Sequence, residues 1–284
     1  NSPELRAAHG EAEEMLAEHG LWVSQNRGLY DAVAAIRWDK EADAPARRLQ
    51  ELALRGFELS GVALEGEARE RYRAISTELT QLTTAFGNAV LDATDGFHID
   101  VRRKETLEGI PESHLARFRA AAKAAGVRGW RIGLQGPDVQ AVLTYARSRS
   151  LRRRLYAANA TRASDQGPQA GQFDNSARIE RILALRHEAA SLLGFPTIAD
   201  RSLATKMAPD PDTVETFLCD LSRPARAAAR RDMAEIAELG RAEFGIARVR
   251  PWDVGFLSEI LRQRRYSFDA EAVRAYFPAD TVTT

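Results

Sequence analysis

The sequence is short of cysteine, of long apolar runs and of net charge, and each shortage argues against a class of protein. Cys219 is the only cysteine among 284 residues, so no disulfide can form within the chain. No apolar run approaches the length of about 20 residues that a membrane-spanning helix requires. Forty basic residues balance forty acidic ones, which argues against nucleic acid and anionic membranes as partners. We therefore expect a globular protein of the reducing cytoplasm.

Several familiar catalytic signatures are missing as well. The chain has no G-x-S-x-G elbow and neither of the glycine-rich loops that cradle phosphate groups. Cys219 lies beside Phe217 and Leu218 on an expected apolar helix face, where a free thiol behaves as a small hydrophobe. We assign no catalytic residue to this chain.

Apolar residues recur at steps of three and four over most of the sequence, which is the spacing of amphipathic helices. Between Glu67 and Ala93 this spacing predicts a core-facing helix of about seven turns. A second helix is predicted from Ser176 to Leu193, with Asp174, Asn175 or Ser176 as N-cap. Gly194 would take the left-handed position that follows its last turn.

A third helix is predicted after Asp210 or Asp212, either of which can cap it. Pro224 should kink or break this helix. We expect three apolar helix faces to build an autonomous core: Ile75-Leu82-Phe86, Ile179-Leu183 and Val214-Phe217-Leu218-Leu221.

Two short segments alternate apolar and polar residues with the period of half-buried strands. They run from Phe97 to Val101 and from Trp130 to Leu134, and we expect them to pair in a direction that the sequence leaves open. Pro111 opens a short helix between them that ends near Gly126. The predicted fold class is therefore mainly all-α, a multi-helix domain with one small two-stranded β element near residues 97–134.

The stretch from Thr161 to Ala208 carries the strings TRASDQGP, DNS, LRHE, LLGF, AD and SLATKMA. Further short strings stand at residues 57–61 (FELSG), 90–94 (VLDAT), 109–113 (GIPES), 251–253 (PWD) and 276–278 (YFP). In order and spacing, this series is similar to the oligopeptidase A branch of the thimet-oligopeptidase-like zinc metallopeptidases. The resemblance covers nearly the whole chain.

The resemblance implies a zinc enzyme that hydrolyses short peptides in a deep channel. Its zinc is held by HExxH on one helix and a downstream Glu, and no HExxH occurs in these 284 residues. We therefore expect residues 1–284 to be the amino-terminal helical, channel-forming part of an oligopeptidase, inactive alone, with the catalytic zinc domain absent from this chain. Its partners would be short peptides and the carboxy-terminal catalytic part. The alternative is a non-catalytic helical scaffold or interaction module of the same ancestry.

One segment comes close to the zinc motif. His187 and Glu188 occupy the first two positions, but Ser191 stands where the second imidazole should be. A neutral hydroxyl is a poor substitute for that ligand. We interpret His187 and Glu188 as surface or structural residues, and we expect no metal site and no cofactor in this chain.

The polar segment from Thr161 to Pro168 is the best candidate for substrate contact, although its Gly-Pro turn also suits a structural junction. The resemblance places a channel wall in this region. The candidates for it are Arg162, Asp165, Asn175, Arg178 and Lys206.

A run of arginines at Arg152, Arg153 and Arg154 raises the possibility of nucleic-acid binding. The chain has no net charge, and no aromatic side chains are interleaved with these arginines. We interpret the run as a solvated helix face.

Overall fold

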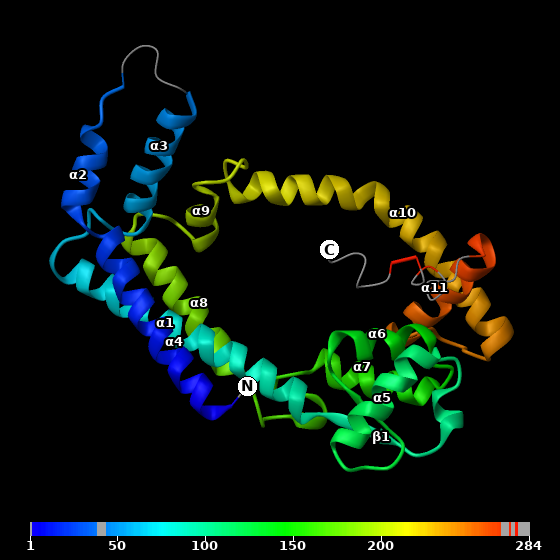
Figure 1. The fold of residues 1–284 in the computed structure, drawn as a ribbon. Coiled ribbons are helices and arrows are strands. Elements are labelled where there is room, and N and C mark those ends of the chain that lie inside the picture. The colour runs from blue at the N-terminus through cyan, green and yellow to red at the C-terminus, as the bar shows by residue number, and fades with distance from the viewer. Residues whose placement is uncertain (1, 39–43, 268–272, 274–275, 278–284) are drawn as a thin grey trace. The chain divides into compact units, whose positions relative to one another are not determined.

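The computed structural model describes residues 2–38, 44–267, 273, 276 and 277, and most of them are helical. The helices are α1 (Pro3–Ser24), α2 (Arg27–Ala35), α3 (Ala44–Leu59), α4 (Gly66–Gly96), α5 (Glu112–Ala124), α6 (Gly136–Tyr145), α7 (Arg149–Ala160), α8 (Ser176–Leu192), α9 (Ile198–Leu203), α10 (Pro211–Phe244) and α11 (Pro251–Tyr266) (Figure 1). Two strands, β1 (His98–Val101) and β2 (Trp130–Gly133), form the one sheet of the described part. The predicted mainly-α class is confirmed. No described helix combines the length and apolar composition needed to cross a bilayer.

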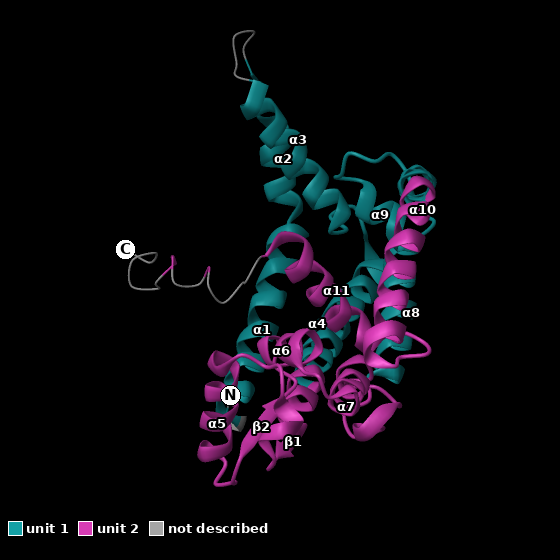
Figure 2. Ribbon diagram, turned by 90° about the vertical axis from the view of Figure 1, so that its right-hand side faces the viewer, with its two compact units in different colours: residues 1–88, 175–222 teal, residues 89–174, 223–284 magenta. Residues whose placement is uncertain are grey.

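The chain divides into two compact units, each made of two separate stretches of sequence. Unit 1 comprises Asn1–Asn88 and Asn175–Ser222, and unit 2 comprises Ala89–Asp174 and Arg223–Thr284 (Figure 2). Of the three boundaries between them, two fall inside the long helices α4 and α10, and the third lies directly before α8.

Unit 1 is held together by the contact of α4 with α8. Tyr72 and Ile75 of α4 are buried with Leu185 and Ala189 of α8, as the apolar stripe on residues 67–93 predicts. Two ion pairs flank this core. Arg71 donates to Glu188 at 2.5 and 2.7 Å, and Arg181 donates to Glu78 at 2.5 and 2.8 Å.

The end of α8 follows the sequence prediction closely. Gly194 has φ +80°, a left-handed conformation that costs glycine little. The Gly194 amide donates to the Ser191 carbonyl at 3.0 Å, and the Phe195 amide donates to the Ala190 carbonyl at 2.9 Å. These two bonds form a Schellman motif, which satisfies carbonyl groups that the helix leaves open.

Helix α10 begins as predicted but does not end where a break was expected. The Asp210 carboxylate accepts the Thr213 amide at 2.7 Å and so caps the helix. Pro224 lies inside a helix that continues to Phe244, so a break at this residue is wrong, and the kink given as the alternative stays a prediction. A proline removes one backbone hydrogen bond, and a long helix keeps the others on both sides.

Two of the three predicted core faces are exposed. Phe217, Leu218 and Leu221 are 61%, 57% and 54% exposed, and on α8 Ile179 and Leu183 are 45% and 56% exposed. The expectation that these faces build the core is therefore wrong. Periodicity shows that a helix has an apolar face but does not show what covers it.

The larger core of unit 2 forms around the sheet. Strands β1 and β2 pair antiparallel, with Ile99 opposite Ile132, and both side chains are buried against α5, α6 and α7. This confirms the predicted pairing and supplies its direction. Gly129 has φ +99°, and a Cβ atom there would lie 2.2 Å from the Val101 carbonyl oxygen, so the turn into β2 requires glycine.

The second core of unit 2 lies between the last part of α10 and α11. Ile236 and Leu239 of α10 are buried with Phe256 and Leu257 of α11. Gly240 allows the close approach, because a Cβ atom at this position would lie 3.1 Å from the Leu257 side chain.

Candidate functional site

The five side chains predicted to line a substrate channel are divided between the two units. Arg162 and Asp165 belong to unit 2, and the other three, Asn175, Arg178 and Lys206, belong to unit 1. Each group is therefore described within its own unit.

Arg162 follows α7 and is half-buried. Its Nη1 donates to the Thr94 hydroxyl at 3.0 Å, and that hydroxyl donates in turn to the Val90 carbonyl at 2.7 Å. The side chain thus joins the segment after α7 to the last turn of α4. Asp165, three residues further on, is exposed.

The polar segment itself is organised by its own hydrogen bonds. The Ser164 hydroxyl donates to the Thr161 carbonyl at 2.8 Å and accepts the Gln166 amide at 3.1 Å. Ala163 is buried with φ 54°, a conformation that non-glycine residues rarely adopt. A Cβ atom at Gly167 would lie 1.9 Å from the Thr161 hydroxyl oxygen, so this turn also needs its glycine.

Asn175 and Arg178 are the two candidates that the structure brings together. Asn175 is 1% exposed, and its Nδ2 donates to the Phe86 carbonyl at 3.3 Å. Its Oδ1 accepts from Arg178 Nη1 at 3.0 Å. Asn175 stands at the predicted N-cap position of α8, but its side chain joins α8 to α4 and makes no capping bond.

Lys206 lies after α9, and its side chain is exposed. Its Nζ donates to the Ser202 hydroxyl at 2.7 Å, one helical turn back. A single bond between exposed groups leaves the ammonium group accessible. Of the five candidates, Lys206 and Asp165 present the most accessible charges, and the channel-lining role of all five remains a prediction.

The near miss to the zinc motif is a structural feature of α8. The Glu188 carboxylate accepts hydrogen bonds from Arg71, and the Ser191 hydroxyl donates to the His187 carbonyl at 3.0 Å. His187 is exposed. Among the described residues, no group of three or more His, Cys, Asp or Glu side chains converges to hold a metal. His187, Glu188 and Ser191 therefore do not form a ligand set for zinc.

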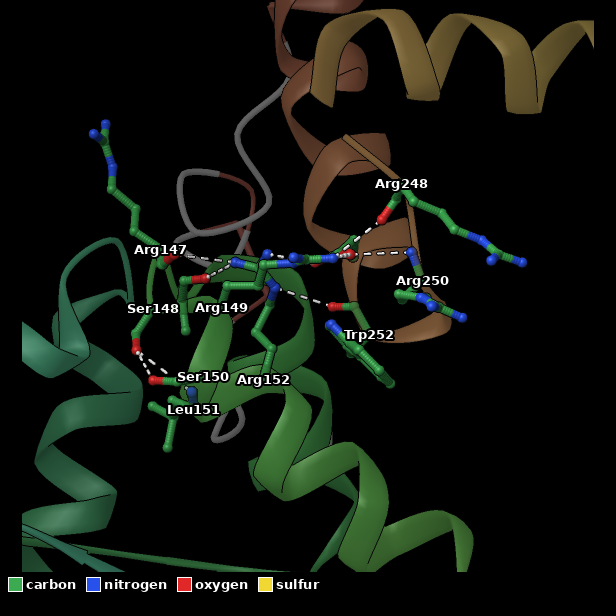
Figure 3. A network of polar contacts seen from close by, with 11 residues as sticks. Arg147, Ser148, Arg149, Ser150, Leu151, Arg152, Arg248, Arg250 and Trp252 are labelled. Atoms are coloured by element: carbon green, nitrogen blue, oxygen red, sulfur yellow. Dashed lines mark hydrogen bonds and ion pairs between the residues drawn. The ribbon is translucent and has the colours of Figure 1, made fainter. Parts of the chain in front are cut away.

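Unit 2 contains a buried charge network that the sequence did not reveal. Asp253, at the start of α11, has a fully buried side chain, and it accepts from Arg149 at 2.8 Å and from Arg152 at 2.9 Å. Figure 3 shows Arg149 and Arg152 of this network beside Arg250 and Trp252. The Arg250 amide donates to the same carboxylate at 3.0 Å. Burial raises the pKa of Asp253, but these hydrogen bonds outweigh burial and hold the pKa below its ordinary value.

Arg152 is the buried cation of this network. It is 1% exposed, and its guanidinium also donates to the carbonyls of Trp252 at 3.0 Å and Ala146 at 2.7 Å. Burial lowers the pKa of Arg152, and the Asp253 carboxylate opposes this effect. The interpretation of residues 152–154 as a solvated face is thus wrong for Arg152, although Arg153 and Arg154 are exposed.

The exposed face of α7 lines two neighbouring cavities. The first, of about 570 Å³, includes Arg102, Arg103 and Arg154 together with the hydroxyls of Ser148 and Ser150. The second, of about 510 Å³, shares Ser150 and Arg154 with the first and also includes Arg149, Arg153, Ala157 and Trp252.

Comparison with known proteins bears on both units. Residues 142–284 match the family model described as "Peptidase family M3", and residues 1–69 match the model described as "Neurolysin/Thimet oligopeptidase, N-terminal domain". The chain belongs to peptidase family M3, and the resemblance found in the sequence is confirmed.

Among individual proteins, the chain is 44% identical to oligopeptidase A of Escherichia coli (strain K12) over 281 residues, covering 98% of this chain and 41% of that protein. It is 42% identical to oligopeptidase A of Haemophilus influenzae, covering 99% of this chain and 42% of that protein. It is 35% identical to "Probable cytosolic oligopeptidase A" of Arabidopsis thaliana, covering 98% of this chain and 40% of that protein. The chain thus spans about two fifths of the length of these relatives.

Proposed function

We propose that the chain forms the helical, substrate-channel part of a zinc-dependent oligopeptidase that hydrolyses short peptides. The observation that carries this proposal is the 44% identity to oligopeptidase A, which extends over 98% of the chain. Membership of peptidase family M3 supports the same reaction class.

In this proposal the zinc belongs to the longer protein. His187, Glu188 and Ser191 do not supply a ligand set, and Glu188 is already paired with Arg71. The cytoplasmic location is part of the proposal too. It is supported by the single cysteine and by the name of the Arabidopsis relative.

A scaffold without hydrolytic activity is the second candidate. The two candidates differ in what a longer reading frame encodes. HExxH followed by a downstream Glu supports the peptidase, and a reading frame without them supports the scaffold.

The proposal is tested on the 284-residue chain and on the longer protein in parallel. Elemental analysis after dialysis should find no stoichiometric zinc in the chain alone, and a quenched oligopeptide should remain uncut. The longer, zinc-loaded protein should cut the same peptide, and a chelator should abolish the cleavage. One tightly held zinc in the 284-residue chain, with chelator-sensitive cleavage, would refute the assignment of catalysis to the rest of the protein.

The channel role is tested with Lys206 and Arg162, which differ in their surroundings. Lys206→Ala removes an exposed ammonium group and should lower kcat/KM in the longer protein without changing zinc content or Tm if the residue touches substrate. Arg162→Ala breaks the bond to Thr94 and should lower Tm. A Lys206→Ala protein with unchanged kcat/KM would remove this residue from the channel wall.

A further inference from the structure

The exposed face of α7 concentrates positive charge in a chain whose net charge is zero. Ser150, Arg153, Arg154 and Ala157 lie at steps of three and four, so they share one face of the helix. This face lines the two cavities of about 570 and 510 Å³.

The guanidinium groups of the larger cavity are available to a ligand. Among the described residues, neither the Arg103 guanidinium nor the Arg154 guanidinium has a hydrogen-bond or ion-pair partner in the protein. The carboxylate in this cavity, Asp100, is already bonded by Arg131 at 2.8 Å through each of its oxygens. No other acidic residue of the described part of the chain lines this cavity, which leaves an excess of positive charge that suits carboxylate groups.

The smaller cavity continues the site with an apolar wall. Ala157 and Trp252 line it, and Arg153 lies over the Trp252 ring at 5.8 Å from its centre. The shared residues Ser150 and Arg154 connect this wall to the arginines of the larger cavity. From Ser150 to Ala157 the helix rises about 10 Å, which matches three to four residues of extended peptide at roughly 3.3 Å each.

We propose that this face of α7, with Arg102 and Arg103 beside it, binds acidic peptide segments. The carboxylates would pair with Arg103 and Arg154, and the apolar part of a neighbouring side chain would contact Ala157 and Trp252. This inference rests on the proposed function, because it names acidic peptides as a preferred class among the short peptides to be handled.

A nucleic acid fits the same arginines less well. Single-stranded nucleic acid is held by bases stacked on open aromatic faces. Among the described residues that line these cavities, Trp252 is the one aromatic. Arg153 lies over its ring, and the ring of Tyr156 lies 5.8 Å from it between centres. One half-buried ring can contact an apolar side chain, but it is not the series of open aromatic faces on which successive bases stack.

The experiment measures binding of blocked tetraglutamate and blocked tetraglutamine to the 284-residue chain by isothermal titration calorimetry at low salt. Tetraglutamate should bind at least about tenfold more tightly and should weaken as salt is added. Arg154→Glu and Arg103→Glu should each weaken tetraglutamate by at least about tenfold, because reversal adds repulsion to the lost bond. Arg128→Glu is the matched control, because Arg128 is an exposed arginine of unit 2 outside both cavities, and it should change the affinity by less than about twofold.

Circular dichroism and thermal melting of each variant identify any loss of fold, and Arg154→Gln provides a milder variant that should still weaken binding. Equal binding of the two peptides, or an equal effect of Arg128→Glu, would overturn the proposal. Tighter binding of a single-stranded oligonucleotide of matched charge would overturn it in favour of nucleic acid. If the longer protein cuts neutral peptides but the 284-residue chain does not bind tetraglutamate, this inference alone is refuted. Tetraglutamate binding together with a longer protein that cuts no peptide would refute the proposed function alone.

Discussion

Removing the negative charge of Asp253 tests the buried network of unit 2 directly. Asp253→Asn preserves the shape of a fully buried side chain, so packing is nearly unchanged and charge is the main variable. Arg152, 1% exposed, would then be a buried guanidinium without a counter-charge. Breaking a buried ion pair from one side costs about 3–5 kcal/mol of unfolding free energy. For a protein of this size that corresponds to a fall in Tm of roughly 6–20 °C.

The assay is urea unfolding at neutral pH, followed by far-ultraviolet circular dichroism. Asp232→Asn serves as the control, because Asp232 is an exposed aspartate of unit 2, and it should change the unfolding free energy by less than about 0.5 kcal/mol. Arg152→Met should cost less in the Asp253→Asn background than in the unaltered chain, since the buried charge has already lost its partner. An Asp253→Asn protein within about 0.5 kcal/mol of the parent would refute the stabilising role of the network.

Three further predictions concern pH, a required glycine and the exposed helix face. Folding lowers the pKa of Asp253, so the ionised carboxylate should contribute to the unfolding free energy above about pH 4. This contribution should be lost as the pH falls through the folded-state pKa. The difference in unfolding free energy between the parent and Asp253→Asn should therefore shrink from pH 6 to pH 3. Gly129→Ala should destabilise by at least about 1–3 kcal/mol in urea unfolding, because φ is +99° and the added Cβ meets the Val101 carbonyl. Phe217→Ser should change the stability of the 284-residue chain by less than about 0.5 kcal/mol, whereas Leu257→Ala should cost about 2–5 kcal/mol, since Leu257 is fully buried and Phe217 is 61% exposed.

Each of these predictions can fail separately. A difference between parent and Asp253→Asn that grows on acidification would reverse the sign assigned to the pKa shift. Gly56→Ala is the control for Gly129, because Gly56 lies inside α3 with open space around it and alanine should stabilise a helix there by up to about 1 kcal/mol. Equal effects of the two alanines would refute the role of φ at Gly129. A large loss of stability from Phe217→Ser would mean that this face is covered in solution.

Local chemistry is the part of the fold that could be predicted from the sequence. The Schellman motif at Gly194, the cap at Asp210 and the strand from His98 to Val101 each depend on residues within a few positions of one another. The break expected at Pro224 failed because local propensity gives the cost of a proline but not the length of helix on either side that can sustain it.

Contacts between distant residues could not be predicted in the same way. Arg149 and Asp253 are 104 positions apart, and nothing in either neighbourhood identifies the other. The buried Asn175 has the same limitation, since its partner, the Phe86 carbonyl, is a backbone group 89 residues away. Two signals were present. The first is that Arg152 lies between Leu151 and Leu155, both of which are buried. The second is that Asp253 ends the string PWD at residues 251–253, which is one of the strings that carry the resemblance to the family.

The distance in sequence between Arg152 and Asp253 has a consequence for synthesis of the protein. Chains leave the ribosome from the amino terminus at about 5–20 residues per second, and domains usually fold as they emerge. Unit 2 begins at Ala89, but the carboxylate that neutralises Arg152 is not made until residue 253. Unit 1 is interrupted as well. Its first stretch ends at Asn88, and its second stretch, Asn175–Ser222, is made only after the first stretch of unit 2. Neither unit can therefore be completed from the first of its two stretches alone. A nascent chain that stalls before Asp253 leaves Arg152 without its carboxylate partner and leaves the apolar surface around Arg152 exposed.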